Sequence, residues 1–175
     1  MFSQAQTLSV RHAPAIICGI PASGKSTYGR WLEREKNVLF IDVEEEDALE
    51  SAGIDELGDA LFADTAQAPS FVNALRRSKR QVVLAWGFPT SCLPCIAALK
   101  DAGVDTWWFD GDRASARQSF IDRADMSVDL FDSQLADIEA HWPDIIQIFG
   151  ARMIQVVGPG QAYLPPKQIY MQMFC

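Results

Sequence analysis

One short segment constrains the fold of this chain more than any other part of it. Residues 19–27 read Gly-Ile-Pro-Ala-Ser-Gly-Lys-Ser-Thr, and they match the pattern G-x-x-x-x-G-K-[ST] at every fixed position. An apolar run of strand length, residues 15–18, directly precedes the segment, and a proline-free stretch, residues 26–36, follows it. A buried strand before the loop and a helix after it are the context in which this pattern binds phosphate.

Most positions of this loop have a role in holding a nucleoside triphosphate. Glycines let the backbone curl so that its N–H groups face phosphate oxygens, and the helix start adds its positive end. Lys25 brings a fixed positive charge to the outer phosphates, and Ser26 offers a hydroxyl to Mg²⁺. Two alternatives stay open, a glycine-rich turn without a ligand and a degenerate loop that binds nucleotide without turning it over. We predict that the whole loop contacts the nucleotide: Gly19, Ile20, Pro21, Ala22, Ser23, Gly24, Lys25, Ser26 and Thr27.

Strand-like apolar runs alternate with helical stretches along the rest of the chain. The alternation predicts βαβ units, and therefore an α/β fold of three layers, α/β/α, with a five-stranded parallel sheet. Pro143 should kink or break the last helix. The expected strands are residues 15–18, 38–41, 81–86, 105–109 and 153–157, and the expected helices are residues 25–36, 68–79, 93–102, 113–124 and 128–149.

Composition narrows the classes of partner. A chain of 175 residues fits a single domain over residues 1–175. Its 23 acidic residues outnumber 15 Lys and Arg, giving a net charge of −8, which favours a small-molecule substrate over a nucleic acid. It contains no run of the roughly twenty apolar residues that a membrane span needs. Residues 1–12 lack the apolar core of a secretory signal and read as a loose arm, so we expect a cytoplasmic protein.

Ligands of such sheets lie at the carboxyl ends of the strands, and the second strand ends in carboxylates. Asp42 directly follows the apolar run and should face the loop, where it could hold Mg²⁺ or take a proton from an attacking hydroxyl. Glu44 could share that work. For Glu45, Glu46 and Asp47 we prefer an acidic, solvated helix start.

Two other strand ends offer pocket walls. The third strand ends in Trp86, Gly87 and Phe88 and lacks the Asp that many nucleoside triphosphatases carry there. Its glycine would let a substrate approach the backbone, and its aromatic side chains could line the pocket or the core. The fifth strand ends in Gly158 and Pro159, which could lie beside an adenine ring or form a plain turn.

Arginines follow the fourth strand. Asp112 should cap the next helix, and Arg113 and Arg117 should share one face of it. Phosphoryl transfer develops negative charge that arginines compensate. Arg123, and then Arg117, are therefore candidates for phosphate contact, and surface ion pairs are the alternative.

Cys92 and Cys95 form a C-x-x-C pair near a predicted helix start. A redox role or a zinc site would be conceivable, but only two histidines exist in the chain, without the paired spacing of a zinc site. We interpret the pair as small apolar residues. The tail, residues 163–175, could pack on the sheet edge or on a second copy in a homodimer.

These features together resemble P-loop small-molecule kinases, with gluconate kinase and shikimate kinase as the nearest types. Residues 131–139, Phe-Asp-Ser-Gln-Leu-Ala-Asp-Ile-Glu, look like the L-x-S-Q-F-x-x-L-E stretch that follows the lid of gluconate kinases. Gly111, Asp112 and Arg123 fall where that family has Gly-Asp and its lid arginine. The resemblance implies the strand order 2-3-1-4-5 and a lid over about residues 117–130, from which Arg123 contacts ATP phosphates.

Asp42 and Glu44 match the D-x-D of shikimate kinases, where one carboxylate serves Mg²⁺ and the other the acceptor hydroxyl. The chain departs from both families at the acceptor. Residues 124–126, Ala-Asp-Met, replace the His-Phe-Met of gluconate kinases, and the glycine triplet of shikimate kinases is reduced to Gly87. The departures indicate an acceptor other than gluconate or shikimate.

The predicted function is that of an ATP-dependent kinase. It would use ATP and Mg²⁺ and transfer the γ-phosphoryl group to a hydroxyl of a small metabolite of the sugar-acid or polyol type. A nucleoside-triphosphate hydrolase, a nucleotide kinase and a non-catalytic nucleotide-binding protein are the alternatives.

Overall fold

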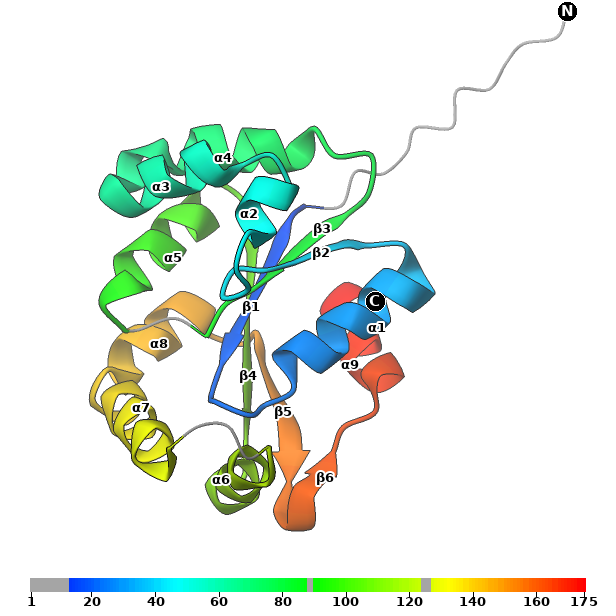
Figure 1. The fold of residues 1–175 in the computed structure, drawn as a ribbon, viewed down its shortest axis with the longest axis vertical. Helices are drawn as coiled ribbons and strands as arrows, with labels where there is room; N and C mark the ends of the chain where they lie inside the picture. Colours follow the sequence, from blue (N-terminus) through cyan, green and yellow to red (C-terminus); the bar gives the residue numbers. More distant parts are fainter. Residues whose placement is uncertain (1–12, 88–89, 124–126) are drawn as a thin grey trace, which may run out of the picture.

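A six-stranded sheet forms the centre of the described part of the chain. The structure is a computed structural model that describes residues 13–87, 90–123 and 127–175. Its strand order is β2-β3-β1-β4-β5-β6, and Figure 1 shows the sheet between two layers of helices. The strands are β1 (Ala15–Gly19), β2 (Leu39–Asp42), β3 (Val82–Ala85), β4 (Asp105–Gly111), β5 (Met153–Gly158) and β6 (Ala162–Tyr163).

The predicted order 2-3-1-4-5 is confirmed, and all pairs among these five strands are parallel. The predicted number of five strands is wrong, because β6 adds an antiparallel edge to β5. Only two residues form β6, and Tyr163 pairs with Val157 across the turn. A strand this short has no periodicity that a sequence could reveal. Because β6 runs antiparallel to β5, the sheet is mixed rather than fully parallel.

Helices cover both faces of the sheet. The short 3₁₀ turns are η1 (Thr65–Gln67), η2 (Thr90–Cys92) and η3 (Pro159–Gln161). The α-helices are α1 (Lys25–Lys36), α2 (Ala48–Ser51), α3 (Asp55–Ala63), α4 (Ala68–Arg76), α5 (Leu93–Asp101), α6 (Arg113–Asp122), α7 (Val128–Ala140), α8 (Trp142–Phe149) and α9 (Pro166–Phe174).

The five predicted helices are found, with shorter carboxyl ends for most of them. The predicted long helix is divided at His141, and Pro143 lies in the first turn of α8, where its fixed φ and missing N–H are tolerated. The predicted helices did not include residues 43–64, where α2 and α3 form, although residues 45–47 were interpreted as an acidic helix start and α2 begins directly after them, at Ala48. Their nine or fewer residues present too little periodicity to stand out from the acidic stretch before them.

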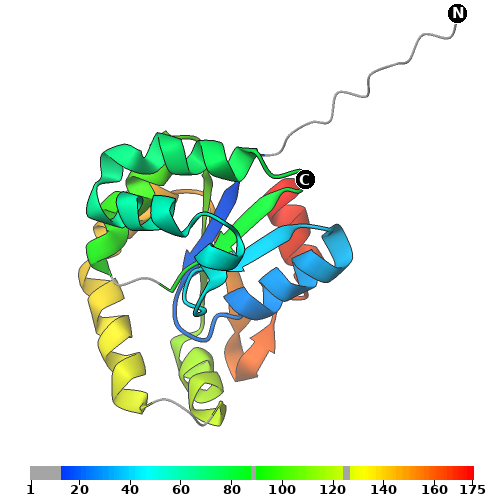
Figure 2. The same cartoon turned by 45° about the horizontal axis from the view of Figure 1, so that its top comes forward.

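Alternate side chains of β1 point into two separate apolar clusters. Ile16 and Cys18 belong to the larger cluster, beneath α3, α4, α5, α7 and α8. Ala15 and Ile17 belong to the smaller cluster, beneath α1 and α9. Figures 1 and 2 show α1 and α9 on one face of the sheet and the helices from α3 to α5 on the other. Burial on both faces explains why β1 is apolar at every position.

The tail packs on its own chain. Ile169 and Met173 of α9 are buried in the smaller cluster, which settles the placement that the sequence left open. A homodimer stays a prediction, as does the single-domain organisation. The predicted arm, residues 1–12, and residues 124–126 of the predicted lid lie outside the described residues. Among the described residues, no helix combines the length and apolar character that crossing a membrane requires.

Candidate functional site

Backbone geometry shapes the loop between β1 and α1. Gly19 has a φ of 151°, and a Cβ atom at this position would lie 2.2 Å from the carbonyl oxygen of Phe109 on β4. Gly24 is left-handed, with a φ of 85°, and caps α1. Both conformations disfavour a side chain. The first N–H groups of α1 have no acceptor within the helix, so the curled loop presents unpaired donors and the positive end of a helix dipole at one place.

The ammonium of Lys25 lies inside this curl. Its Nζ donates hydrogen bonds to the carbonyl oxygens of Gly19, at 3.3 Å, and Ile20, at 3.2 Å, and the residue is 9% exposed. Burial lowers the pKa of Lys25, while the nearby carboxylates of Glu44 and Asp42 act in the opposite direction. The loop therefore holds a cation at its centre.

Asp42 and Ser26 bring two oxygen atoms that could ligate a metal close together beside the loop. Ser26 Oγ donates to Asp42 Oδ2 at 2.6 Å, and Asp42 Oδ1 accepts from the backbone N–H of Glu44 at 3.3 Å. A hydroxyl and a carboxylate are ligands that Mg²⁺ accepts, together with phosphate oxygens and waters. No group of three or more His, Cys, Asp or Glu side chains suited to a metal occurs in the described ranges, so a cation here would depend on the nucleotide for further ligands.

Glu44 points toward the end of β3. Its Oε2 accepts a hydrogen bond from the N–H of Gly87 at 3.1 Å. A Cβ atom on Gly87 would lie 2.6 Å from that oxygen, so the glycine makes room for the carboxylate. The sequence interpretation, in which Gly87 admits a substrate to the backbone, did not foresee this. Burial raises the pKa of Glu44, and the charge of Lys25 and the Gly87 hydrogen bond lower it.

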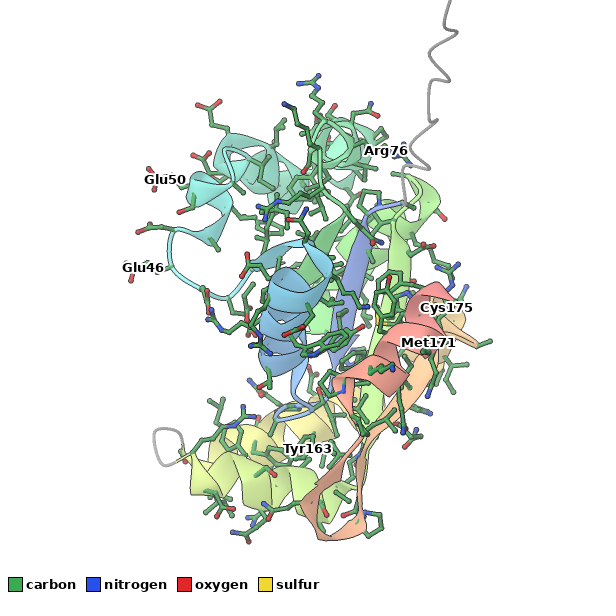
Figure 3. The ribbon with its side chains drawn as sticks, turned by 90° about the vertical axis from the view of Figure 1, so that its right-hand side faces the viewer. Glu46, Glu50, Arg76, Tyr163, Met171 and Cys175 are labelled. Carbon is green, nitrogen blue, oxygen red and sulfur yellow. The ribbon has the colours of Figure 1, made fainter. Side chains whose placement is uncertain are left out.

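The rest of the acidic stretch lies at the surface. Glu45 forms an ion pair with Arg30 of α1, and both side chains are at least half exposed. Figure 3 shows Glu46 and Glu50 pointing away from the molecule. This arrangement agrees with the preferred interpretation of solvated carboxylates, so Asp42 and Glu44 alone turn toward the loop among the acids of residues 42–47.

A cavity of about 800 Å³ joins these groups. The loop and Glu44 form one wall, and α7 forms the facing wall. The α7 residues on this wall are spaced as one helix face, and sequence reasoning assigned them no role although their spacing could have indicated a shared face. The lining residues are Gly19, Pro21, Ala22, Ser23, Gly24, Lys25, Ser26, Thr27, Glu44, Gly87, Phe120, Arg123, Ser133, Gln134, Asp137 and Ile138.

A second cavity, of about 380 Å³, shares the start of α1 and Arg123 with the first and extends toward the turn between β5 and β6. The hydroxyls of Ser23 and Tyr28 are buried and have no hydrogen-bond partner among the described residues. Both residues line this cavity, and Ser23 also lines the first. A buried hydroxyl without a partner is costly, so these two groups have hydrogen-bonding capacity that a ligand or a water molecule in this cavity could satisfy.

Tyr163 of β6 ties the edge of the sheet to the loop. Its hydroxyl donates to the carbonyl oxygen of Ala22 at 2.8 Å, and its ring lies 3.6 Å from the position of a Cβ on Gly24. Ala22 has a φ of 57°, which is uncommon for a residue with a side chain. Figure 3 labels Tyr163 beside the first turn of α1. Sequence reasoning missed this contact, because it joins residues 141 positions apart.

Other predicted residues are held away from the loop. Arg117 makes two hydrogen bonds to Asp132 of α7, at 2.8 and 2.9 Å, and Arg113 pairs with Asp110. Gly158 and Pro159 lie at the end of β5 and in η3, outside the linings of both cavities. The roles of Arg117, Gly158 and Pro159 in nucleotide binding stay predictions.

The capping prediction for α6 is confirmed, because Asp112 accepts from the N–H of Ser115 at 2.8 Å. Cys92 and Cys95 lie at the start of α5 as free thiols. Burial raises the pKa of Cys95 to about 11, whereas a reactive thiol has a lowered pKa. This direction agrees with the interpretation of the pair as packing residues.

Three solved structures share this fold. A gluconokinase from Sinorhizobium meliloti 1021 is 18% identical, with a TM-score of 0.53 over 93% of this chain and 90% of that one. A shikimate kinase from Acinetobacter baumannii in complex with shikimate is 19% identical, with a TM-score of 0.54 over 92% and 93%. One from Bacteroides thetaiotaomicron is 18% identical, with a TM-score of 0.52 over 82% and 85%. No protein-family model and no curated protein matches the sequence. The chain thus has the α/β fold of P-loop small-molecule kinases, a likeness of fold at low sequence identity.

Proposed function

We propose that the chain is an ATP-dependent phosphotransferase whose acceptor is a hydroxyl of a small metabolite. One observation carries the proposal. A single cavity brings together the loop cation Lys25, a second cation on Arg123 and the carboxylate of Glu44. Cations and loop amides are suited to a polyphosphate, and a carboxylate facing them is suited to an attacking hydroxyl.

The nucleotide would span the two cavities. Its β- and γ-phosphates would lie in the loop beside Lys25, and its base in the second cavity, between Arg123 and Tyr163. The shared lining at Ser23, Gly24, Thr27 and Arg123 supports this assignment, since it makes the two spaces neighbours. The free hydroxyl of Ser23 would then find its partner in a phosphate oxygen.

Mg²⁺ would be held by Ser26 and Asp42, whose hydroxyl and carboxylate oxygens lie 2.6 Å apart beside the loop. The ion would neutralise part of the charge on the phosphates. Asp42 is 6% exposed and does not line the cavity, whereas Glu44 does. This difference favours separate tasks, with Asp42 at the metal and Glu44 at the acceptor.

In the transfer step, the acceptor oxygen forms a bond to the γ-phosphorus. The bond from that phosphorus to the oxygen bridging the β- and γ-phosphates breaks, and ADP leaves with the electron pair. The hydroxyl proton passes to the carboxylate of Glu44, and the raised pKa of this group suits a proton acceptor. Lys25 and Arg123 stabilise the charge that develops on the transferred oxygens.

Thermal unfolding with Mg-ATP and ATP consumption with a panel of hydroxyl metabolites test the proposal. We expect Mg-ATP to raise the melting temperature of the wild type and to leave that of Lys25→Ala unchanged. Consumption should rise only when a suitable acceptor is added. Steady consumption without an acceptor would instead identify a hydrolase, and binding without consumption on a broad panel would identify a nucleotide-binding protein.

A further inference from the structure

The part of the larger cavity that would hold the phosphate acceptor, called the acceptor end below, is lined by two carboxylates. On one side lies Glu44, and on the facing wall α7 contributes Ser133, Gln134 and Asp137. Asp137 is fixed in place, because its Oδ2 accepts a 2.6 Å hydrogen bond from the hydroxyl of Thr90. Its other oxygen, Oδ1, lies 3.4 Å from Nδ1 of His141, but the side chain is still 46% exposed, so the carboxylate is accessible to a ligand beside these two partners. Two carboxylates and neutral hydrogen-bonding groups therefore define this end.

The cations of the cavity belong to the loop and to the end of α6, and the charge of Lys25 also acts on Glu44. Among the described residues, the cations that line the cavity are Lys25 and Arg123. Lys25 is bonded to loop carbonyls, and Arg123 also lines the second cavity. The neighbouring arginines of α6 are engaged elsewhere, Arg113 with Asp110 and Arg117 with Asp132.

A bound polyphosphate would occupy these two cations. The buried, unpartnered hydroxyl of Ser23 independently points to a ligand at the loop end of the same cavity. An acceptor with a carboxylate or phosphate would then face Glu44 and Asp137 while both described cations of the cavity lining are occupied. Like charges at close range repel strongly when partly shielded from water. An ammonium group would instead meet a carboxylate, in a charge-assisted hydrogen bond.

We propose that the phosphate acceptor is a hydroxyl compound without negative charge, preferably an amino alcohol or amino sugar whose ammonium contacts Asp137 while Glu44 takes the hydroxyl proton. The inference rests on the proposed kinase function and narrows it, because it removes sugar acids from the expected acceptors and keeps polyols.

Matched acceptors that differ in charge test this inference. One set is glucosamine, glucose and gluconate, and the other is 2-amino-1,3-propanediol, glycerol and glycerate. ATP consumption with Mg²⁺ is measured with each compound, and Mg-ATP binding is measured separately by calorimetry. We expect the amine to be the best acceptor of its set, the neutral compound to follow and the acid to be the poorest.

The outcomes separate the two proposals. Faster consumption with gluconate or glycerate than with the matched amine and neutral compound would overturn the charge inference and leave the kinase function standing. If no compound of either set increases ATP consumption, the result would count against the kinase function itself, and the charge inference would fall with it. Calorimetry would still show whether the loop binds Mg-ATP.

Variants of α7 locate the ammonium. Asp137→Asn keeps an acceptor oxygen for Thr90 and removes the charge. We expect it to raise KM for the amine by roughly tenfold or more, the effect of losing one charge-assisted hydrogen bond, with KM for ATP and for the neutral compound unchanged. Asp144→Asn is the control, since Asp144 is exposed on α8 and lies outside this cavity.

A gain-of-charge variant keeps the test valid if Asp137→Asn folds poorly. Gln134→Glu adds a carboxylate to the same wall. It should lower KM for the amine and raise KM for the acid further. An unchanged ratio of amine to acid in both variants would overturn the assignment of the ammonium to α7.

Discussion

The two ends of the larger cavity are built in different ways. Apart from Arg123 at the end of α6, the loop end comes from one continuous segment, residues 19–27, whose shape depends on glycine conformations and backbone N–H groups. The acceptor end is assembled from three distant segments: the side chain of Glu44 after β2, the backbone of Gly87 after β3 and the inner face of α7. A loop fixed by its own backbone tolerates most changes elsewhere, whereas an end assembled from distant side chains depends on how those segments pack.

The largest expected effect is the loss of turnover when the loop cation, Lys25, is removed. Lys25→Ala removes the charge that would stabilise the transferred phosphoryl group, so turnover should fall by about 10²–10³-fold, the scale found when one preorganised charge donor is lost. Mg-ATP affinity, measured by calorimetry, should fall as well. Lys167→Ala on the exposed start of α9 is the control. Turnover near the wild-type value would contradict a role for the loop in transfer.

A single methyl group should disable the acceptor end alone. Gly87→Ala places a Cβ atom 2.6 Å from Glu44 Oε2, and the carboxylate must move. Displacing a reacting group by about 1 Å costs on the order of 10²-fold in rate, while Mg-ATP affinity should stay unchanged.

The double variant Gly87→Ala with Glu44→Gln gives the matching control, measured by steady-state kinetics. It should be no slower than Glu44→Gln alone, because both changes disable the same group. Additive losses would show that Gly87 acts through something other than Glu44.

The pH profile of kcat/KM should report both ends at once. Protonation of Glu44 removes the proton acceptor, so the rate should fall as pH decreases through its pKa, which burial raises above the usual value of about 4.3. Deprotonation of Lys25 removes the loop cation, and its lowered pKa should begin the alkaline decline below the usual value of about 10.4. Glu44→Gln should lose the acid limb and keep the alkaline one. Persistence of the acid limb would assign it to another group.

The smallest expected effect concerns the tie between β6 and the loop. Tyr163→Phe removes the hydrogen bond to the Ala22 carbonyl, and one such bond contributes about 0.5–1.5 kcal/mol. Mg-ATP should therefore bind roughly 2- to 12-fold more weakly, with the acceptor KM unchanged. Tyr170→Phe on α9 serves as the matched control, since Tyr170 lines neither cavity. Equal affinity in Tyr163→Phe and the wild type would show that the loop keeps its shape unaided.

The same contrast explains what the sequence could predict. The loop is a local pattern, so its residues and the surrounding βαβ alternation were readable along the chain, and the order of the first five strands is confirmed. The bond of Tyr163 to the loop and the carboxylate of Asp137 on the cavity wall depend on tertiary packing. No spacing in the sequence relates residue 22 to residue 163, and the two-residue strand β6 has no periodicity of its own. Of the acceptor end, Glu44 and Gly87 were predicted as site residues, whereas the contribution of α7 became apparent only from the fold.

The most direct test is a crystal structure of the chain with Mg²⁺ and a non-hydrolysable ATP analogue. The account predicts the triphosphate inside the curl of residues 19–27, with Lys25 Nζ turned from the carbonyls of Gly19 and Ile20 toward phosphate oxygens and Glu44 facing the γ-phosphate across the cavity. A curl that stays closed by Lys25 at saturating analogue, with no heat of binding in solution, would contradict it.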